Sequence, residues 1–218
     1  MNYSDYVTNH KEEMLDALKE LLRIPSVLEH YNPKQKKAPF GDAIAQALNS
    51  MLKRGEDDGF ATKDIAAHAG HIEWGEGEEI LGILTHMDVV PAKTGEWTRP
   101  PFEPYIKDGK IYGRGSMDDK GPTIAAYFAM KFLRELGIEP KKRIRLIMGT
   151  DEETAWRGIE RYLEKEAMPT AGFSPDAEFP VIHGEKGIFS FDLEGPFKSG
   201  PLKRFDAGER YTVVPDVA

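Results

Sequence analysis

Residues 112–122 of the chain are YGRGSMDDKGP, a stretch in which we expect a loop to become a helix. Two adjacent carboxylates, Asp118 and Asp119, follow a glycine-rich turn and precede Gly121-Pro122. Proline suits the first turn of a helix, where its missing N–H leaves no hydrogen bond unmade. Since carboxylates also favour helix starts, simple capping explains this pair by itself as well as a binding site does.

Working outward from this stretch, helix-like and strand-like segments alternate along the chain. Helical spacing of apolar residues predicts helices over 4–24, 41–54, 123–136 and 154–166. Strands are predicted over 61–67, 71–74, 80–84, 143–148, 177–182 and 187–193, with a hairpin over 105–112. This alternation favours an α/β layered domain. The runs ILGIL (80–84) and RIRLIM (143–148) are typical of strands buried on both faces.

The composition excludes several classes of partner and site. The 218 residues carry a net charge of −8 and no cysteine, so thiolate metal sites, disulfides and cysteine nucleophiles are absent. An acidic chain without a basic stripe is a poor partner for nucleic acid or an anionic membrane. The polar N-terminus and the lack of an apolar run of about 20 residues predict a cytoplasmic location without membrane contact.

Polar groups follow the two buried runs directly. His86 and Asp88 come after the first run, and alternate residues of a strand point the same way. Either both reach one site, or His86 reaches it while Asp88 orients the imidazole from behind. A lone histidine at a strand end is usually an ordinary buried residue, but His86 has other candidate ligands elsewhere in the chain.

Adjacent carboxylates recur at Glu152 and Glu153, which follow the second buried run. Alone, they would be interpreted as the charged first turn of a helix. Together with Asp118 and Asp119 they suggest a cation, because neighbouring buried carboxylates repel one another. A histidine with several carboxylates and no thiol suits Zn²⁺, Mn²⁺ or Co²⁺. One member of a Glu-Glu pair can bind metal while the other takes a proton from water.

Four motifs in this order resemble a known family. They are THMDVVP (85–91), YGRGSMDDKGP (112–122), GTDEE (149–153) and PDAEFP (175–180). Together they resemble the co-catalytic zinc peptidases, which include aminoacylases, carboxypeptidases and dipeptidases. The last motif and HGEKG (183–187) are most similar to the dipeptidase V branch, often called Xaa-His dipeptidases. The resemblance implies a three-layer catalytic domain with a central mixed sheet flanked by helices.

The resemblance also assigns metal ligands. It implies two Zn²⁺ ions, for which Mn²⁺ or Co²⁺ can substitute, with Asp118 bridging them. His86 and Asp176 would bind one ion and Glu153 the other. The peptide bond between Asp118 and Asp119 would be cis.

The implied reaction is the hydrolysis of dipeptides with a free N-terminus. A metal-bound hydroxide would attack the peptide carbonyl, with Glu152 as general base and Asp88 orienting His86. Two alternatives stay open at this stage. One is an N-acyl amino acid amidohydrolase on the same scaffold, and the other is a catalytically inactive metal-binding fragment.

The chain is shorter than members of this family, which insert a lid domain and then complete the catalytic domain. We therefore expect residues 1–187 to be the N-terminal part of the catalytic domain. Residues 188–218 would be the end of that segment and the first strand of a truncated lid. The last zinc-binding histidine and the lid's oxyanion donors would then be missing, which predicts impaired activity. An exposed sheet edge would favour self-association.

Overall fold

The computed structural model describes residues 2–178, 180–184, 186–187 and 195. The chain divides into two compact units, Met1–Asp176 and Ala177–Ala218, and the described helices and strands all lie in the first. The helices are α1 (Tyr3–Leu22), α2 (Asp42–Asp57), α3 (Lys120–Glu135) and α4 (Arg157–Leu163), with a 3-10 turn, η1 (Thr94–Glu96). The strands are β1 (Ala61–Asp64), β2 (Ala69–Trp74), β3 (Ile80–His86), β4 (Tyr105–Lys107), β5 (Lys110–Tyr112), β6 (Arg143–Gly149) and β7 (Ala171–Phe173).

Five strands form one mixed sheet in the order β1-β2-β6-β3-β7. Strand β3 runs parallel to β6 and β7, whereas β2 runs antiparallel to β6 and β1. The register pairs His86, the last residue of β3, with Gly149, the last residue of β6. Because parallel strands end at the same edge of a sheet, the loops after β3 and β6 start next to each other.

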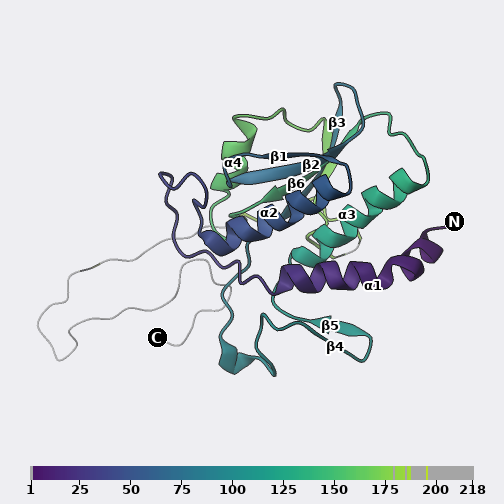
Figure 1. Cartoon of the computed structure of the whole chain (residues 1–218). Coiled ribbons are helices and arrows are strands. Elements are labelled where there is room, and N and C mark those ends of the chain that lie inside the picture. The colour runs from purple at the N-terminus through teal and green to yellow at the C-terminus, as the bar shows by residue number, and fades with distance from the viewer. Residues whose placement is uncertain (1, 179, 185, 188–194, 196–218) are drawn as a thin grey trace, which may run out of the picture. The chain divides into compact units, whose positions relative to one another are not determined.

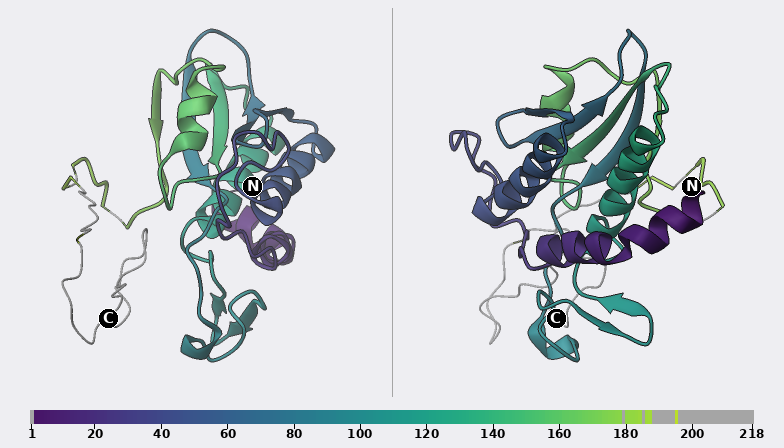
Figure 2. Two further views of the ribbon diagram at one scale, coloured as in Figure 1. Left: turned by 90° about the vertical axis from the view of Figure 1, so that its left-hand side faces the viewer. Right: turned by 45° about the vertical axis from the view of Figure 1, so that its right-hand side comes forward.

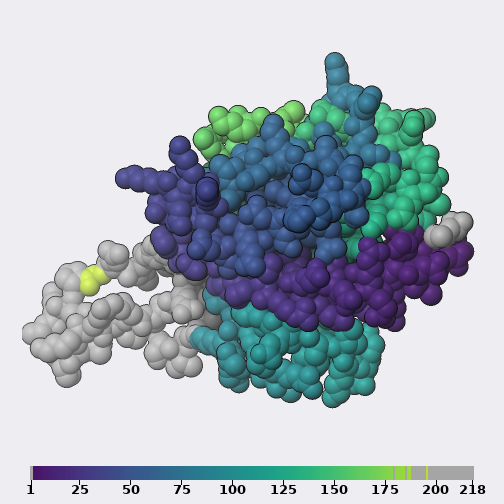
Figure 3. All heavy atoms as spheres, in the orientation of Figure 1, coloured from purple at the N-terminus to yellow at the C-terminus, as the bar shows by residue number. Residues whose placement is uncertain are grey.

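Helices cover both faces of this sheet, which makes three layers. Helices α2 and α3 pack on one face, with α1 against α3, and α4 lies against the other face (Figures 1 and 2). In the space-filling view, α1 and α2 form a continuous outer surface (Figure 3). The neighbouring β6 residues Leu146 and Ile147 belong to different core clusters and are both buried. Strand β6 is thus buried on both faces, and the predicted α/β three-layer class is confirmed.

A buried lysine connects the end of α1 with the start of α3. The Lys120 side chain is fully buried, and its Nζ donates to the carbonyls of Leu21 at 3.0 Å and Ile24 at 2.8 Å. These hydrogen bonds supply donors to carbonyls at and just after the end of α1, where intrahelical donors run out. Burial lowers the pKa of Lys120 to about 7. The pair Asp118-Asp119, directly before α3, is thereby fixed against the end of α1.

The segment after α1 supports the loop after β3. The Ser26 hydroxyl donates to the carbonyl of Met87 at 2.6 Å, and the Val89 amide donates to the carbonyl of Ser26 at 3.0 Å. Val27 and Val89 form an isolated parallel bridge. The backbone on both sides of Asp88 is therefore fixed before any ligand is considered.

The structure corrects some predicted elements. None of the described residues in the range 177–182 is in a strand, so the strand predicted there is wrong. The edge strand is instead β7, whose three exposed residues show no apolar pattern and pair with β3. The last predicted helix is limited to α4, because residues 152–155 form a turn. The predicted hairpin is present as β4–β5, with positive φ at Asp108 (51°) and Gly109 (74°).

The predicted division of the chain stays a prediction. The boundary after residue 187 and the strand predicted over 187–193 fall mostly on residues 188–194 and 196–218, which lie outside the described residues. Within the described part of the chain, no helix is both long and apolar enough to cross a bilayer.

Candidate active site

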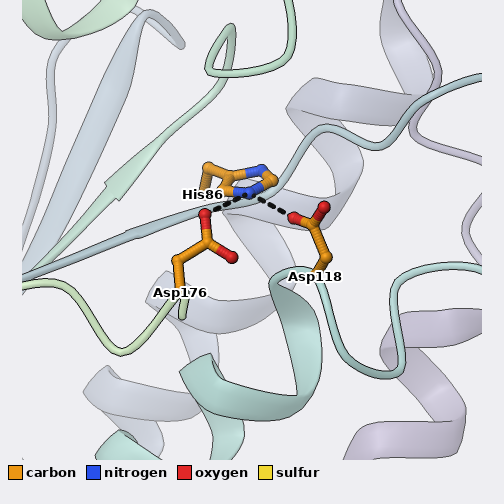
Figure 4. A group of neighbouring side chains, drawn as sticks. All are labelled: His86, Asp118 and Asp176. Carbon is orange, nitrogen blue, oxygen red and sulfur yellow. Dashed lines mark hydrogen bonds and ion pairs between the residues drawn. The ribbon is translucent and has the colours of Figure 1, made fainter. Parts of the chain in front are cut away.

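The candidate site lies at the edge where β3 and β6 end, and His86 is at its centre. The His86 side chain is 2% exposed, and its Nε2 lies 2.9 Å from Asp118 Oδ1 and 3.4 Å from Asp176 Oδ2 (Figure 4). Asp118 comes from the loop before α3, and Asp176 from the segment after β7. Three segments far apart in the sequence thus bring a nitrogen and two carboxylates together.

The pair Asp118 and Asp119 contacts two different parts of His86. Their peptide bond is cis, as the resemblance implies. Asp118 faces the imidazole, whereas Asp119 Oδ2 accepts a hydrogen bond from the His86 backbone amide at 3.0 Å. Asp119 is fully buried, its Oδ1 has no hydrogen-bond partner in the described structure, and burial raises the pKa of Asp119 to about 8. Asp119 therefore fixes the backbone from which His86 projects.

Asp88 contacts His86 and the turn after β6 at once. Its backbone carbonyl lies 2.9 Å from His86 Nδ1, and its carboxylate oxygen Oδ1 lies 3.5 Å from the same nitrogen. Its carboxylate also accepts hydrogen bonds from the amides of Glu152 at 3.1 Å and Glu153 at 3.0 Å. Of the two arrangements open from the sequence, the structure has Asp88 behind the imidazole. The contact with the turn after β6 is an addition that the sequence did not predict.

Glu152 and Glu153 complete the ring of carboxylates. Glu152 Oε2 lies 3.9 Å from His86 Nε2. Burial, followed by Asp118 and other neighbouring carboxylates, raises the pKa of Glu153 to about 7. Burial and the nearby carboxylates also raise the pKa of Glu152. For His86, burial alone would lower the pKa, but hydrogen bonds to surrounding carboxylates raise it overall. Beyond the effect of burial, neighbouring carboxylates contribute to all three shifts, and a cation placed among them would be favoured.

The donor atoms fit a divalent metal ion. Two groups place their ligand atoms within 4.8 Å of one another, namely His86 with Asp118 and Asp176, and His86 with Glu152 and Glu153. A histidine with carboxylates suits Zn²⁺, and Mn²⁺ or Co²⁺ accept the same donors. The structure thus gathers every predicted ligand.

The sequence does not predict two contacts that support the site. The role of Asp119 has no signal in the sequence beyond the carboxylate next to it. Arg157, which binds Asp151 at the start of the turn after β6, had no signal beyond its place near a predicted helix start.

Comparison with known proteins places this site in a family. Residues 82–195, more than half of the chain, match the model of peptidase family M20/M25/M40. The chain belongs to this family. The matched M20 segment contains His86, Asp118, Glu152 and Asp176.

Relatives in bacteria support the same assignment. The M20 chain is 45% identical over 224 residues to YtjP of Bacillus subtilis and 48% identical over 223 residues to a protein of Staphylococcus saprophyticus. The names of both class them provisionally as dipeptidases. These matches cover 100% and 99% of the chain but 48% and 47% of the two relatives, so the chain spans about half of their length.

Solved structures agree on the fold. Human carnosine dipeptidase 1 matches 74% of the chain with a TM-score of 0.62 and 25% identity, the match covering 36% of that protein. An M20 family metallo-carboxypeptidase of Sulfolobus solfataricus matches 75% of the chain with a TM-score of 0.60 and 27% identity, covering 37% of that protein. The recognition from four short motifs is therefore confirmed at the level of the family.

Proposed function

We propose that this M20 chain forms the metal-holding part of a dipeptidase that hydrolyses dipeptides with a free N-terminus. The observation that carries the proposal is the gathering of Asp118, Asp176, Glu152 and Glu153 around the buried imidazole of His86. The provisional names of the bacterial relatives support a dipeptide substrate.

The proposed ligands divide between two zinc ions. His86 and Asp176 would hold one, Glu153 would hold the other, and Asp118 would bridge them. Zinc bound there would polarise the scissile carbonyl and lower the pKa of a water molecule. Mn²⁺ or Co²⁺ would serve in the same donor set.

Asp88 prepares His86 for its role as a ligand. A carbonyl oxygen only accepts hydrogen bonds, so the contact of 2.9 Å requires the proton on His86 Nδ1. In the neutral imidazole that a metal requires, the lone pair is then on Nε2, the nitrogen that faces Asp118 and Asp176. A hydrogen bond that fixes the tautomer in this way is the usual support of a metal-binding histidine.

Glu152 is the proposed general base. Its Oε2 lies 3.9 Å from His86 Nε2, farther than Asp118 Oδ1 at 2.9 Å. This position leaves the Glu152 carboxylate free to accept a proton from water. Burial and neighbouring carboxylates raise the pKa of Glu152, which brings it closer to the operating pH and makes it a stronger base.

Metal content tests the proposal directly. After dialysis against trace zinc, elemental analysis should find about one zinc per wild-type chain, or about two if the Glu153 position also fills, and none in His86→Ala. A folded wild-type chain that retains no zinc would contradict the proposal.

A substrate panel separates the alternatives. Hydrolysis of dipeptides but not of N-acetyl amino acids would support the dipeptidase. The reverse preference would identify an N-acyl amino acid amidohydrolase on the same scaffold. Zinc binding without any turnover would identify a metal-binding fragment.

Two further expectations remain proposals. One is a cytoplasmic location, which cell fractionation tests. The other is self-association through the outer edge of β7, the last strand in the sheet order, whose three residues are exposed. Sedimentation velocity of Phe173→Lys and wild type would show whether that edge joins two copies.

A further inference from the structure

The turn that carries Glu152 and Glu153 needs support of its own. Residues 152–155 have no helix or strand structure. The carboxylate of Asp88 holds the amides of Glu152 and Glu153, but these contacts fix the backbone at one point only. A catalytic carboxylate must stay within about 0.5 Å of its working position. The direction of both side chains therefore depends on what closes the rest of the turn.

An ion pair between the buried Asp151 and the partly exposed Arg157 closes it. Arg157 Nε donates to Asp151 Oδ2 at 2.7 Å, and Arg157 NH2 donates to Asp151 Oδ1 at 2.9 Å. This is the two-pronged geometry that makes arginine–carboxylate pairs strong and directional. The Arg157 amide and the Thr154 hydroxyl donate to the same carboxylate, and the Trp156 amide donates to the Asp151 carbonyl at 2.9 Å. The Asp151 side chain has 0% exposure, so both its oxygens are satisfied within the turn.

Aromatic rings hold the arginine from outside the turn. The guanidinium carbon of Arg157 lies 4.4 Å from the ring centre of Tyr31 and 5.5 Å from that of Phe40. These two rings are stacked with centroids 4.9 Å apart, and both belong to the segment between α1 and α2. A guanidinium stacked on aromatic faces is restricted in position as well as stabilised. The turn after β6 is thus tied to a separate part of the fold.

We propose that Arg157, acting through Asp151, is a positioning residue that keeps Glu152 and Glu153 directed at His86. The inference rests on the proposed function, in which Glu153 is a metal ligand and Glu152 the base. Without the guanidinium, the buried Asp151 carboxylate loses its charged partner, and the turn relaxes to hydrate it. The two glutamates lie in that turn, so their carboxylates move away from His86 although Asp88 still holds their amides.

Cobalt binding to the full chain tests this role without relying on turnover. Co²⁺ absorbs visible light according to its ligands, so one titration reports both affinity and coordination. Wild type is compared with Arg157→Met and Arg143→Met. A third variant, Arg157→Lys, keeps the charge but cannot form the two parallel hydrogen bonds to Asp151. Arg143 is the matched control, because its side chain is 24% exposed against 30% for Arg157 and also binds a carboxylate, at the opposite end of β6.

We expect Arg157→Met to bind Co²⁺ about tenfold more weakly with an altered visible spectrum. Arg157→Lys should recover only part of the affinity, and Arg143→Met should match wild type. If Arg157→Met does not fold, Thr154→Val, which removes one donor to Asp151, decides the question by a smaller shift in the same direction. Wild-type affinity and spectrum in the folded Arg157 variants, or an equal loss in Arg143→Met, would overturn the inference alone. A wild-type chain that does not bind Co²⁺ would overturn the proposed function and the inference with it.

Discussion

Two buried histidines of the same sheet have opposite preferences for a proton. His86 ends β3 and His71 lies in β2, and both are at most 5% exposed. Hydrogen bonds to carboxylates raise the pKa of His86 although burial opposes the shift. Burial, with a further contribution from Arg145, lowers the pKa of His71 to about 4. Burial is common to both, so the charge of the neighbours decides between them.

The surroundings of His71 form a closed network. Arg145 donates to Tyr162 Oη at 3.1 Å and to a Glu73 carboxylate oxygen at 2.6 Å. The Tyr162 hydroxyl also lies 2.8 Å from His71 Nδ1. Because arginine can only donate, the hydroxyl accepts from Arg145 and donates its own proton to His71. Glu166 binds Arg145 and the Lys63 ammonium. Here Arg145 and Lys63 form ion pairs with the carboxylates, whereas in the described part of the chain Asp118, Asp176 and Glu152 form theirs with His86. We call the carboxylates around His71 the balanced cluster and those around His86 the unbalanced cluster, and only the second is a candidate metal site.

The largest expected effect concerns the unbalanced cluster of carboxylates around His86. Glu152→Gln should reduce dipeptide hydrolysis about 10²–10⁴-fold while zinc content stays at the wild-type level, because the amide cannot accept a proton. Steady-state rates and elemental analysis on the same preparation measure both. Glu166→Gln, in the balanced cluster, is the control and should keep its turnover per folded chain. Wild-type turnover by Glu152→Gln would show that Glu152 is not the general base.

Acid should destabilise the balanced cluster through His71. The pKa falls from 6.5 to about 4 on folding, so the unfolded chain binds the proton first. This contribution to stability is complete above pH 6.5 and is lost as the pH falls towards 4, amounting to about 3 kcal/mol. Urea unfolding at several pH values should show this loss in wild type and a smaller one in His71→Asn. Equal losses in both chains would mean that other groups cause it.

Zinc should stabilise the chain through the unbalanced cluster. At a free concentration 100 times its Kd, zinc should raise the free energy of unfolding by about 2.7 kcal/mol. Thermal unfolding with and without zinc measures this effect. The stabilisation should persist in His71→Asn and vanish in His86→Ala, and a zinc effect that survives in His86→Ala would place the metal elsewhere.

The smallest effect is expected at the rim of the balanced cluster. The Lys63 side chain is 55% exposed, so Lys63→Met should change the free energy of unfolding by less than about 1 kcal/mol although Lys63 contacts Glu166. Arg145→Met should cost about 3–5 kcal/mol, because it removes the buried cation that Glu73 and Glu166 share and leaves them only the more exposed Arg143 and Lys63. Denaturant midpoints of the two variants measure the contrast. Similar losses of stability would show that the exposure of a cation does not determine how much it contributes.

The sheet was largely predictable because its central strands have a strong sequence signal. Strands β3 and β6 are apolar runs because both of their faces are covered, and the layered class follows from them. Strand β7 has three exposed residues, so neither apolar content nor alternation marks it. Its pairing with β3 depends on backbone hydrogen bonds, which composition does not encode.

The site was predictable as a set of residues but not as a set of contacts. The motifs named His86 and its carboxylates. The hydrogen bonds from the Glu152 and Glu153 amides to Asp88 depend on the register that sets His86 opposite Gly149. No local pattern reports a register between strands about 60 residues apart in the chain.

The buried Lys120 has a consequence for how the molecule opens. Its Nζ donates to the carbonyls of Leu21 and Ile24, so the end of α1 cannot separate from the start of α3 without breaking both buried hydrogen bonds. Helix ends usually fray, and their amides exchange with solvent through small local openings. The last turn of α1 should instead exchange its amide hydrogens only together with the start of α3. Helix α1, which contributes no residue to the two candidate metal groups, should thus belong to the same cooperative unit as the loop that carries Asp118.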